Sequence, residues 1–162
     1  MSIWSLILFI PWQAYKTGFF QSQLSNNNIK IIPFNYTNFY PSYTKFYNKI
    51  LSWNMGVVPV GNVLGCAIYL SVNMGYKEVL IYGAEHSWTV DLRVNEQNQV
   101  CTVKRHFFED EEILVPWLKS NNEVFKMAEI LDSLKNHFRG YEYLNWYANS
   151  KNCKIFIIFI FK

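Results

Sequence analysis

The chain has 162 residues, of which 51% are hydrophobic and 19% aromatic, enough to bury one sizeable core and too many for a disordered chain. Charged residues make up 17% of the chain and the formal net charge is +3, with lysines and arginines scattered, so the sequence lacks the basic stripe of a nucleic-acid-binding protein. Its three cysteines, Cys66, Cys101 and Cys153, are spaced too widely for a disulfide framework or a zinc site, which favours a reducing compartment.

The first part of the chain predicts a strand, a helix and a second strand. Residues 4–10 form an apolar run typical of a strand buried on both faces, and the segment lacks the basic start and cleavage site of a signal peptide. Pro11 suits the first turn of a helix, which we expect to continue through residues 12–24. A strand is then expected at residues 29–34, and a short helix after Pro41.

The middle of the chain predicts a helix, a glycine cap and a buried strand. Apolar residues within Val63–Val72 recur at helical spacing, and Gly65 and Ala67 allow this helix to approach a sheet closely. Gly75 suits the cap of the helix, because glycine tolerates a left-handed backbone. The apolar run Val79–Tyr82 is typical of a central buried strand.

The segment after that strand is polar. We expect residues 84–120 to be irregular, apart from a small hairpin with its turn at Asn95–Asn98. The acidic run at residues 109–112 could bind a divalent metal, but its position before an apolar segment favours the solvated start of a helix.

The C-terminal part predicts two helices and a strand. An amphipathic helix is expected over residues 121–138, an interruption at Gly140, and a second helix over residues 141–151. The apolar run 153–161 is far shorter than the ~20 residues that span a bilayer, so we expect a strand there. Alternating strands and helices indicate an α/β fold with a mostly parallel, Rossmann-like sheet flanked by helices, in a single domain over residues 1–162.

Functional side chains are concentrated directly after the strand Val79–Tyr82. The chain there reads Gly-Ala-Glu-His-Ser-Trp, and ligands of open α/β sheets bind at the carboxyl ends of the strands. The alternative is that these residues cap the strand and cover the rim of the core, and spacing by itself leaves both interpretations open. The candidate residues are Glu85, His86, Ser87 and Trp88.

The segment GNVLGCAIYLSVNMGYKEVLIYGAEHSW resembles the central part of bacterial glycosyltransferases that make capsule and lipooligosaccharide. The likeness is greatest to α-2,3-sialyltransferases that use CMP-sialic acid, which have a helix, a Gly-Tyr-Lys-Glu turn and a strand ending in Gly-x-Asp. The chain is also similar to a broader group from surface-polysaccharide gene clusters, in which Gly-x-Asp-His-Ser-Trp recurs. The resemblance covers residues 56–156 and implies transfer of a sugar from a nucleotide donor.

The resemblance implies roles for individual residues. His106 matches a loop histidine of the family that takes the proton from the acceptor hydroxyl, and the hairpin should return it close to the strand end. Ser87 stands where the sialyltransferases carry a tyrosine that assists the departing phosphate, and Glu85 replaces their aspartate. We therefore expect His106 and Ser87 to be catalytic, and the substrate-binding residues to be Glu85, His86, Trp88 and Asn62. No metal and no cofactor are expected, since the nucleotide sugar, such as CMP-sialic acid, is a substrate.

The chain departs from the family at its start. It has no Gly-Asn-Gly-Pro-Ser-type loop, whose backbone N–H groups hold the nucleotide phosphates in the family. We therefore expect a fragment of a larger domain, incomplete at the N-terminus, that binds nucleotide sugars weakly or not at all.

The predicted function is that of a glycosyltransferase-like protein of capsule or lipopolysaccharide biosynthesis. Its expected partners are a nucleotide sugar and a glycan acceptor, without nucleic acid, and its expected location is the cytoplasm, with peripheral association at the inner face of the membrane as an option. Two alternatives stay open: a non-catalytic remnant or interaction module, and a diphosphokinase-like enzyme of related fold, which would need carboxylates that hold magnesium.

Overall fold

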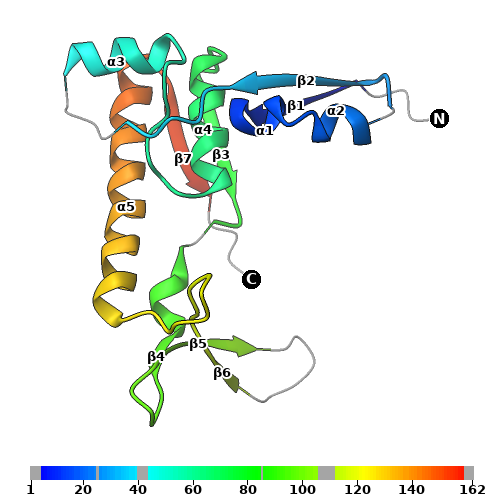
Figure 1. Cartoon of the computed structure of the whole chain (residues 1–162). Helices are drawn as coiled ribbons and strands as arrows, with labels where there is room; N and C mark the ends of the chain where they lie inside the picture. Colours follow the sequence, from blue (N-terminus) through cyan, green and yellow to red (C-terminus); the bar gives the residue numbers. More distant parts are fainter. Residues whose placement is uncertain (1–4, 25, 40–43, 85, 106–111, 159–162) are drawn as a thin grey trace. The chain divides into compact units, whose positions relative to one another are not determined.

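The protein has a mixed α/β architecture with small parallel and antiparallel sheets (Figure 1). The structure is a computed structural model that describes residues 5–24, 26–39, 44–84, 86–105 and 112–158. The chain divides into two compact units: unit 1 comprises Met1–Val79 and Gly140–Lys154, and unit 2 comprises Leu80–Arg139 and Ile155–Lys162.

Unit 1 begins with a strand–helix–strand segment. Strands β1 (Leu6–Pro11) and β2 (Ile29–Phe34) pair in parallel, and the helices α1 (Trp12–Lys16) and α2 (Phe19–Gln23) connect them. Gly18, at φ +71°, divides the predicted helix into these two pieces.

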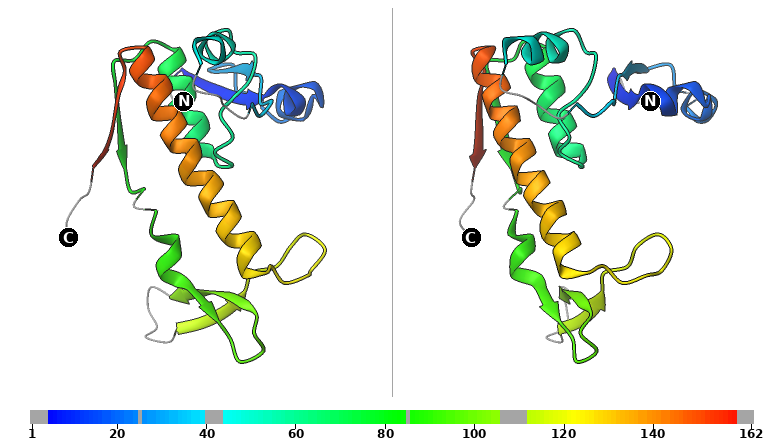
Figure 2. Two further views of the ribbon diagram at one scale, coloured as in Figure 1. Left: turned by 90° about the vertical axis from the view of Figure 1, so that its left-hand side faces the viewer. Right: turned by 60° about the vertical axis from the view of Figure 1, so that its left-hand side comes forward.

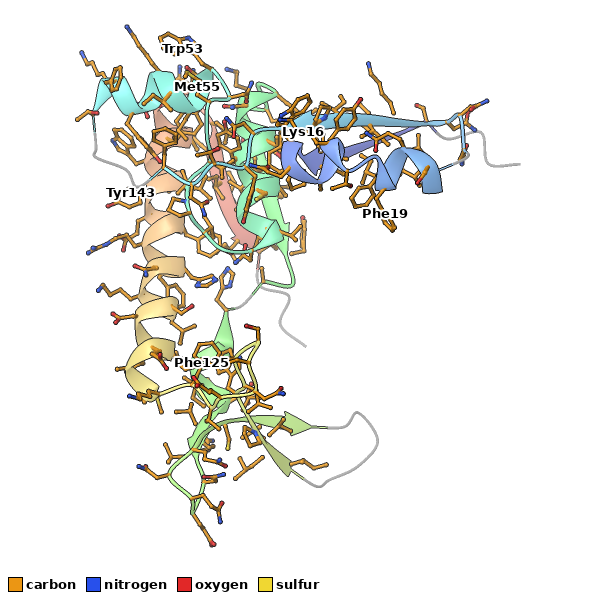
Figure 3. The ribbon with its side chains drawn as sticks, viewed as in Figure 1. Lys16, Phe19, Trp53, Met55, Phe125 and Tyr143 are labelled. Carbon is orange, nitrogen blue, oxygen red and sulfur yellow. The ribbon has the colours of Figure 1, made fainter. Side chains whose placement is uncertain are left out.

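The predicted burial of the first strand on both faces is wrong. Leu6 and Ile7 are 55% and 49% exposed, because β1 has a single hydrogen-bonded neighbour in the described chain and a sheet of two strands cannot enclose it. Phe19 on α2 is also exposed, at 59% (Figure 3).

The helices α3 (Lys45–Ser52) and α4 (Val63–Asn73) follow where the sequence predicts helices. The side chain of Asn62 caps α4, its Oδ1 accepting a hydrogen bond of 2.9 Å from the Gly65 amide. Gly75, at φ +87°, ends the helix in the left-handed conformation expected of it.

One buried side chain, Val60, separates α4 from the helix α5 (Met127–Ser150). A Cβ atom built on Gly65 of α4 would lie 2.7 Å from the Val60 Cγ2, and one built on Gly140 of α5 would lie 3.0 Å from the same atom and from the Pro59 carbonyl oxygen. Glycine at both positions therefore allows both helices to contact the same valine, which is 2% exposed.

The predicted interruption at Gly140 is wrong, because α5 is continuous through it (Figure 2). A glycine within a helix costs about 1 kcal/mol relative to alanine. The close approach of Val60 gives this glycine a packing role, so it marks a contact and not the end of a helix.

Strands β3 (Glu78–Tyr82) and β7 (Lys154–Ile158) form a second two-stranded sheet and run in the same direction (Figures 1 and 2). Both strands were predicted, but the central, buried position of β3 was not correct. Leu80 and Tyr82 are 51% and 58% exposed, because β3 pairs with β7 alone among the described strands. The described residues thus contain no clear Rossmann sheet.

Unit 2 contains a 3-10 helix, η1 (Ser87–Asp91), and an antiparallel sheet of β4 (Leu92–Val94), β5 (Val100–Arg105) and β6 (Glu112–Pro116). The sheet packs on the first turns of α5 through Val100, Ile130 and Leu134. Phe125 adds an edge contact with Trp117, with ring centroids 6.5 Å apart (Figure 3).

The predicted helix start at residues 109–112 is wrong at Glu112, which pairs with Arg105 of β5 as the first residue of β6. The apolar residues that follow it pair across the sheet, and this pairing determines the local structure. The rest of the acidic run lies outside the described residues.

We predict that Gly65→Ala destabilises the protein by about 1–3 kcal/mol, although alanine is the better helix former. The added methyl group would overlap Val60, whose backbone is also in contact with α5. Chemical denaturation followed by circular dichroism measures this change. Val63→Ala is the matched control in the same helix, since Val63 is 84% exposed, and a loss of stability in the control as large as that of Gly65→Ala would contradict the steric explanation.

Candidate functional site

The chain leaves β3 through a turn that contains two left-handed residues. Gly83 has φ +69° and His86 has φ +52°, and η1 begins at the next residue. The other described non-glycine residues with positive φ are all asparagines, and both asparagine and histidine adopt this conformation more often than most side chains. A left-handed non-glycine residue costs about 1–3 kcal/mol and is found preferentially at functional sites, so the backbone at His86 supports the choice of this turn as a candidate site.

The ring of His86 is half-buried against an aromatic side chain of α5. It meets the Phe138 ring edge to face, with centroids 6.2 Å apart and planes at 81°. This contact holds one side of the imidazole within unit 2.

The structure describes the predicted strand-end cluster only in part. Glu85 and His106 lie outside the described residues, and Ser87 and Trp88 are described in their backbone alone, within η1. The predicted proximity of His106 to Ser87 therefore stays a prediction.

The hairpin that should return the chain to this turn is confirmed. Strands β4 and β5 pair antiparallel, with Leu92 opposite Thr102, and the turn closes through hydrogen bonds between Asn95 and Gln99. The turn uses Asn98 in a left-handed conformation, at φ +58°. Strand β5 also packs against η1 and ends at Arg105, the residue before His106.

A second candidate site is an open groove in unit 1 with a volume of about 590 Å³. It lies where the carboxyl ends of β1 and β2 meet one face of α4, and its lining is mostly apolar. The strand side contributes Phe9, Pro11, Phe34 and Tyr36, and the helix side runs from Gly61 to Met74.

Asn62, predicted to bind substrate, lines this groove at the start of α4. Besides capping the helix, its Nδ2 donates a hydrogen bond of 2.9 Å to the Tyr141 hydroxyl on α5. In the structure, the Asn62 side chain therefore joins the start of α4 to α5.

Two titratable side chains in the groove are held neutral. Burial raises the pKa of the Cys66 thiol, and a hydrogen bond from the Tyr36 hydroxyl offsets part of that rise. Burial and the adjacent Cys66 raise the pKa of Tyr36. Neither group ionises near neutral pH, so the groove presents no charge from them.

Sequence reasoning missed the groove, because it assigned the apolar residues of α4 entirely to packing. The available signal was the pair of predicted parallel strands, each with aromatic residues at its carboxyl end: Phe9 in the first strand, and Phe34 followed by Tyr36 in the second. Where these residues meet α4 depends on tertiary packing.

Comparisons with models of protein families, with curated proteins and with solved structures gave no match to this chain. The resemblance to sialyltransferases therefore remains a prediction. Within the described ranges, no group of three or more His, Cys, Asp and Glu residues could hold a metal ion, and no helix is long and apolar enough to cross a membrane.

A group of buried tyrosines in unit 1 has strongly shifted pKa values, which can mark a functional site. Tyr69 and Tyr147 stack with ring centroids 6.2 Å apart, and burial raises the pKa of Tyr69 to about 12. The Tyr69 hydroxyl donates to the Leu51 carbonyl at 2.8 Å, and Tyr147 donates to Asn73. These contacts join α3, α4 and α5, so we assign the tyrosines a structural role.

We predict that stability falls as the pH rises from about 10 to 12. Tyr69 has its ordinary pKa near 10 when unfolded and a pKa of about 12 when folded, so in this range the unfolded state loses the proton first. The stabilisation is fully present below pH 10 and disappears as the pH approaches 12. Denaturation midpoints measured across this range test the prediction.

Tyr69→Phe removes one of the titrating groups, so it should reduce the slope of this part of the pH profile while lowering stability at neutral pH. A residual slope is expected, because burial also raises the pKa of Tyr47 and of Tyr147. Tyr76→Phe is the control, because Tyr76 is 55% exposed. Equal slopes above pH 10 in the two variants would contradict the assignment to Tyr69.

Proposed function

We propose that this protein is a glycosyltransferase-like protein of surface-polysaccharide biosynthesis, which transfers a sugar from a nucleotide donor to a glycan acceptor. The observation that carries the proposal is the path of the chain around η1. A left-handed turn at His86 leads into η1, and β5 then packs against η1 and ends immediately before His106. This path is the reason to propose that His106 acts as the base in a reaction at the turn.

In the proposed reaction the acceptor hydroxyl attacks the anomeric carbon of the donor, and its proton passes to the imidazole of His106. The bond between that carbon and the phosphate oxygen breaks, and the electron pair leaves with the nucleotide. Ser87 and His86 donate hydrogen bonds to the leaving phosphate or the sugar, Glu85 binds a sugar hydroxyl, and Trp88 contributes a face for the sugar ring. Asn62 is assigned no step, because its amide is engaged with Gly65 and Tyr141.

The proposal includes the finer expectations of the family. These are a Rossmann-like arrangement of the parallel strands, a cytoplasmic location at the inner face of the membrane, and a nucleotide sugar and a glycan as partners. The two small parallel sheets, β1–β2 and β3–β7, are compatible with a Rossmann-like arrangement without amounting to one.

A second candidate function is non-catalytic binding, and the groove of unit 1 favours it. Its volume of about 590 Å³ is typical of small-molecule sites. Tyr36 and Cys66 are neutral in it, and the described lining residues include no His, Asp, Glu or Lys that could act as a general base.

We predict that the full chain transfers sugar from a nucleotide donor supplied at high concentration. The test incubates the chain with CMP-sialic acid or a UDP-hexose and a panel of oligosaccharides, and follows the product by mass spectrometry. His106→Ala should lower the turnover by about 10²–10⁴-fold, the usual contribution of a general base.

The matched control is His137→Ala. The His137 ring lies on α5, where its Nδ1 is 2.7 Å from the Ser133 carbonyl oxygen of the same helix, and the proposal gives it no catalytic role. Equal turnover in wild type and His106→Ala would reject the base. Absence of transfer with every donor, together with ligand binding in the groove, would favour the second candidate.

A further inference from the structure

The groove of unit 1 follows α4 along its whole length. The helix residues in its wall are spaced three and four positions apart, so they form one straight stripe: Val63, Cys66, Ala67, Leu70, Ser71 and Met74. At 1.5 Å per residue, the stripe from Val63 to Met74 is about 16 Å long. The residues at the two ends of the stripe are solvent-exposed, Val63 at 84% and Met74 at 52%.

Among the described residues that line the groove, none is charged, and each polar side chain has a partner within the protein. The Ser71 hydroxyl donates to the Ala67 carbonyl at 2.8 Å. Tyr36 and Cys66 share a hydrogen bond. The Asn62 Oδ1 accepts a hydrogen bond from the Gly65 backbone N–H, and its Nδ2 donates one to the Tyr141 hydroxyl.

These contacts select against a polar ligand. A phosphate or a sugar hydroxyl that entered the groove would lose hydrogen bonds to water, and the polar side chains of the wall are already engaged in hydrogen bonds within the protein. An aliphatic chain loses no hydrogen bonds on entry and gains contact with Phe9, Leu70 and Met74.

We infer that the groove along α4 binds a straight aliphatic chain, such as the hydrocarbon part of an amphiphile. The length of the stripe suits a linear chain better than a single planar ring, and a polar head group beside the exposed Val63 or Met74 would remain in water. Two flexible side chains, Leu70 and Met74, adapt to the chain without a fixed shape. This site does not depend on the proposed sugar transfer.

Straight-chain alcohols from hexanol to dodecanol are suitable probes, titrated into the isotope-labelled full chain below their solubility limits. Two-dimensional NMR should show the largest shifts at backbone amides of α4. The affinity should rise by up to about fourfold for each added methylene, and level off once the chain exceeds the length of the groove.

Ala67→Glu should weaken decanol binding at least tenfold, because it places a carboxylate in the middle of the stripe. Ala67 is solvent-exposed, so the change leaves the core intact. Ala128→Glu, at an exposed position of α5, is the matched control and should bind like wild type. Met74→Glu provides a second variant at the open end of the groove, and circular dichroism verifies that all three fold.

Several results would overturn the inference. Alcohols that bind with no dependence on chain length, or equally well to Ala67→Glu, would show that the groove is not the site. If cytidine or CMP shifted the NMR signals of the α4 amides and the alcohols did not, the groove would be a nucleoside site. Binding to phosphatidylcholine vesicles without alcohol binding would indicate a membrane-contacting surface. A dimer that dissociates in Ala67→Glu would indicate an interface between copies.

Discussion

The packing of unit 1 depends on Val60, a small side chain held between two helices. Gly65 in α4 and Gly140 in α5 are both in contact with it, and neither position has room for a Cβ atom without a shift. The hydrogen bond between Asn62 and Tyr141 joins the same two helices next to this contact. One face of α4 packs against Val60 and α5, and its opposite face lines the groove.

The core of unit 1 uses tyrosine hydroxyls where many proteins place only hydrocarbon. Tyr69 and Tyr147 are almost fully buried, yet their hydroxyls reach Leu51 and Asn73, so their burial leaves no hydroxyl unpaired. Among the described residues, none that is buried is charged. This core is therefore sensitive to alkaline pH through its tyrosines, which must stay neutral to remain inside.

The two candidate sites call for different chemistry. The turn after β3 presents a half-buried imidazole and a strained backbone, features suited to handling polar groups. The groove along α4 presents apolar surface and polar side chains that already have partners.

Local signals in the sequence were sufficient to predict most elements. The apolar run before Gly83 predicted β3, the spacing within Val63–Val72 predicted α4, and the polar turn at Asn95–Asn98 predicted the hairpin. These features depend on backbone preferences and on periodicity within a few residues, which a sequence displays directly. The candidate turn at His86 was located in the same way, since it follows a strand that ends at a glycine.

Only the tertiary structure decided how deeply the strands are buried, why a glycine stands at position 140, and that a groove forms along α4. An apolar run shows that a strand can be buried, but the exposure of Leu80 depends on how many strands pair beside it. A glycine in a helical pattern permits either an interruption or a close contact, and only the position of Val60 selects the contact. The groove likewise requires residues from two strands and a helix that are distant in the chain. The sequence by itself therefore determined most of the helices and strands, but not β6 or the continuity of α5. The tertiary structure decided which faces of these elements meet, because that choice depends on contacts between residues far apart in the chain.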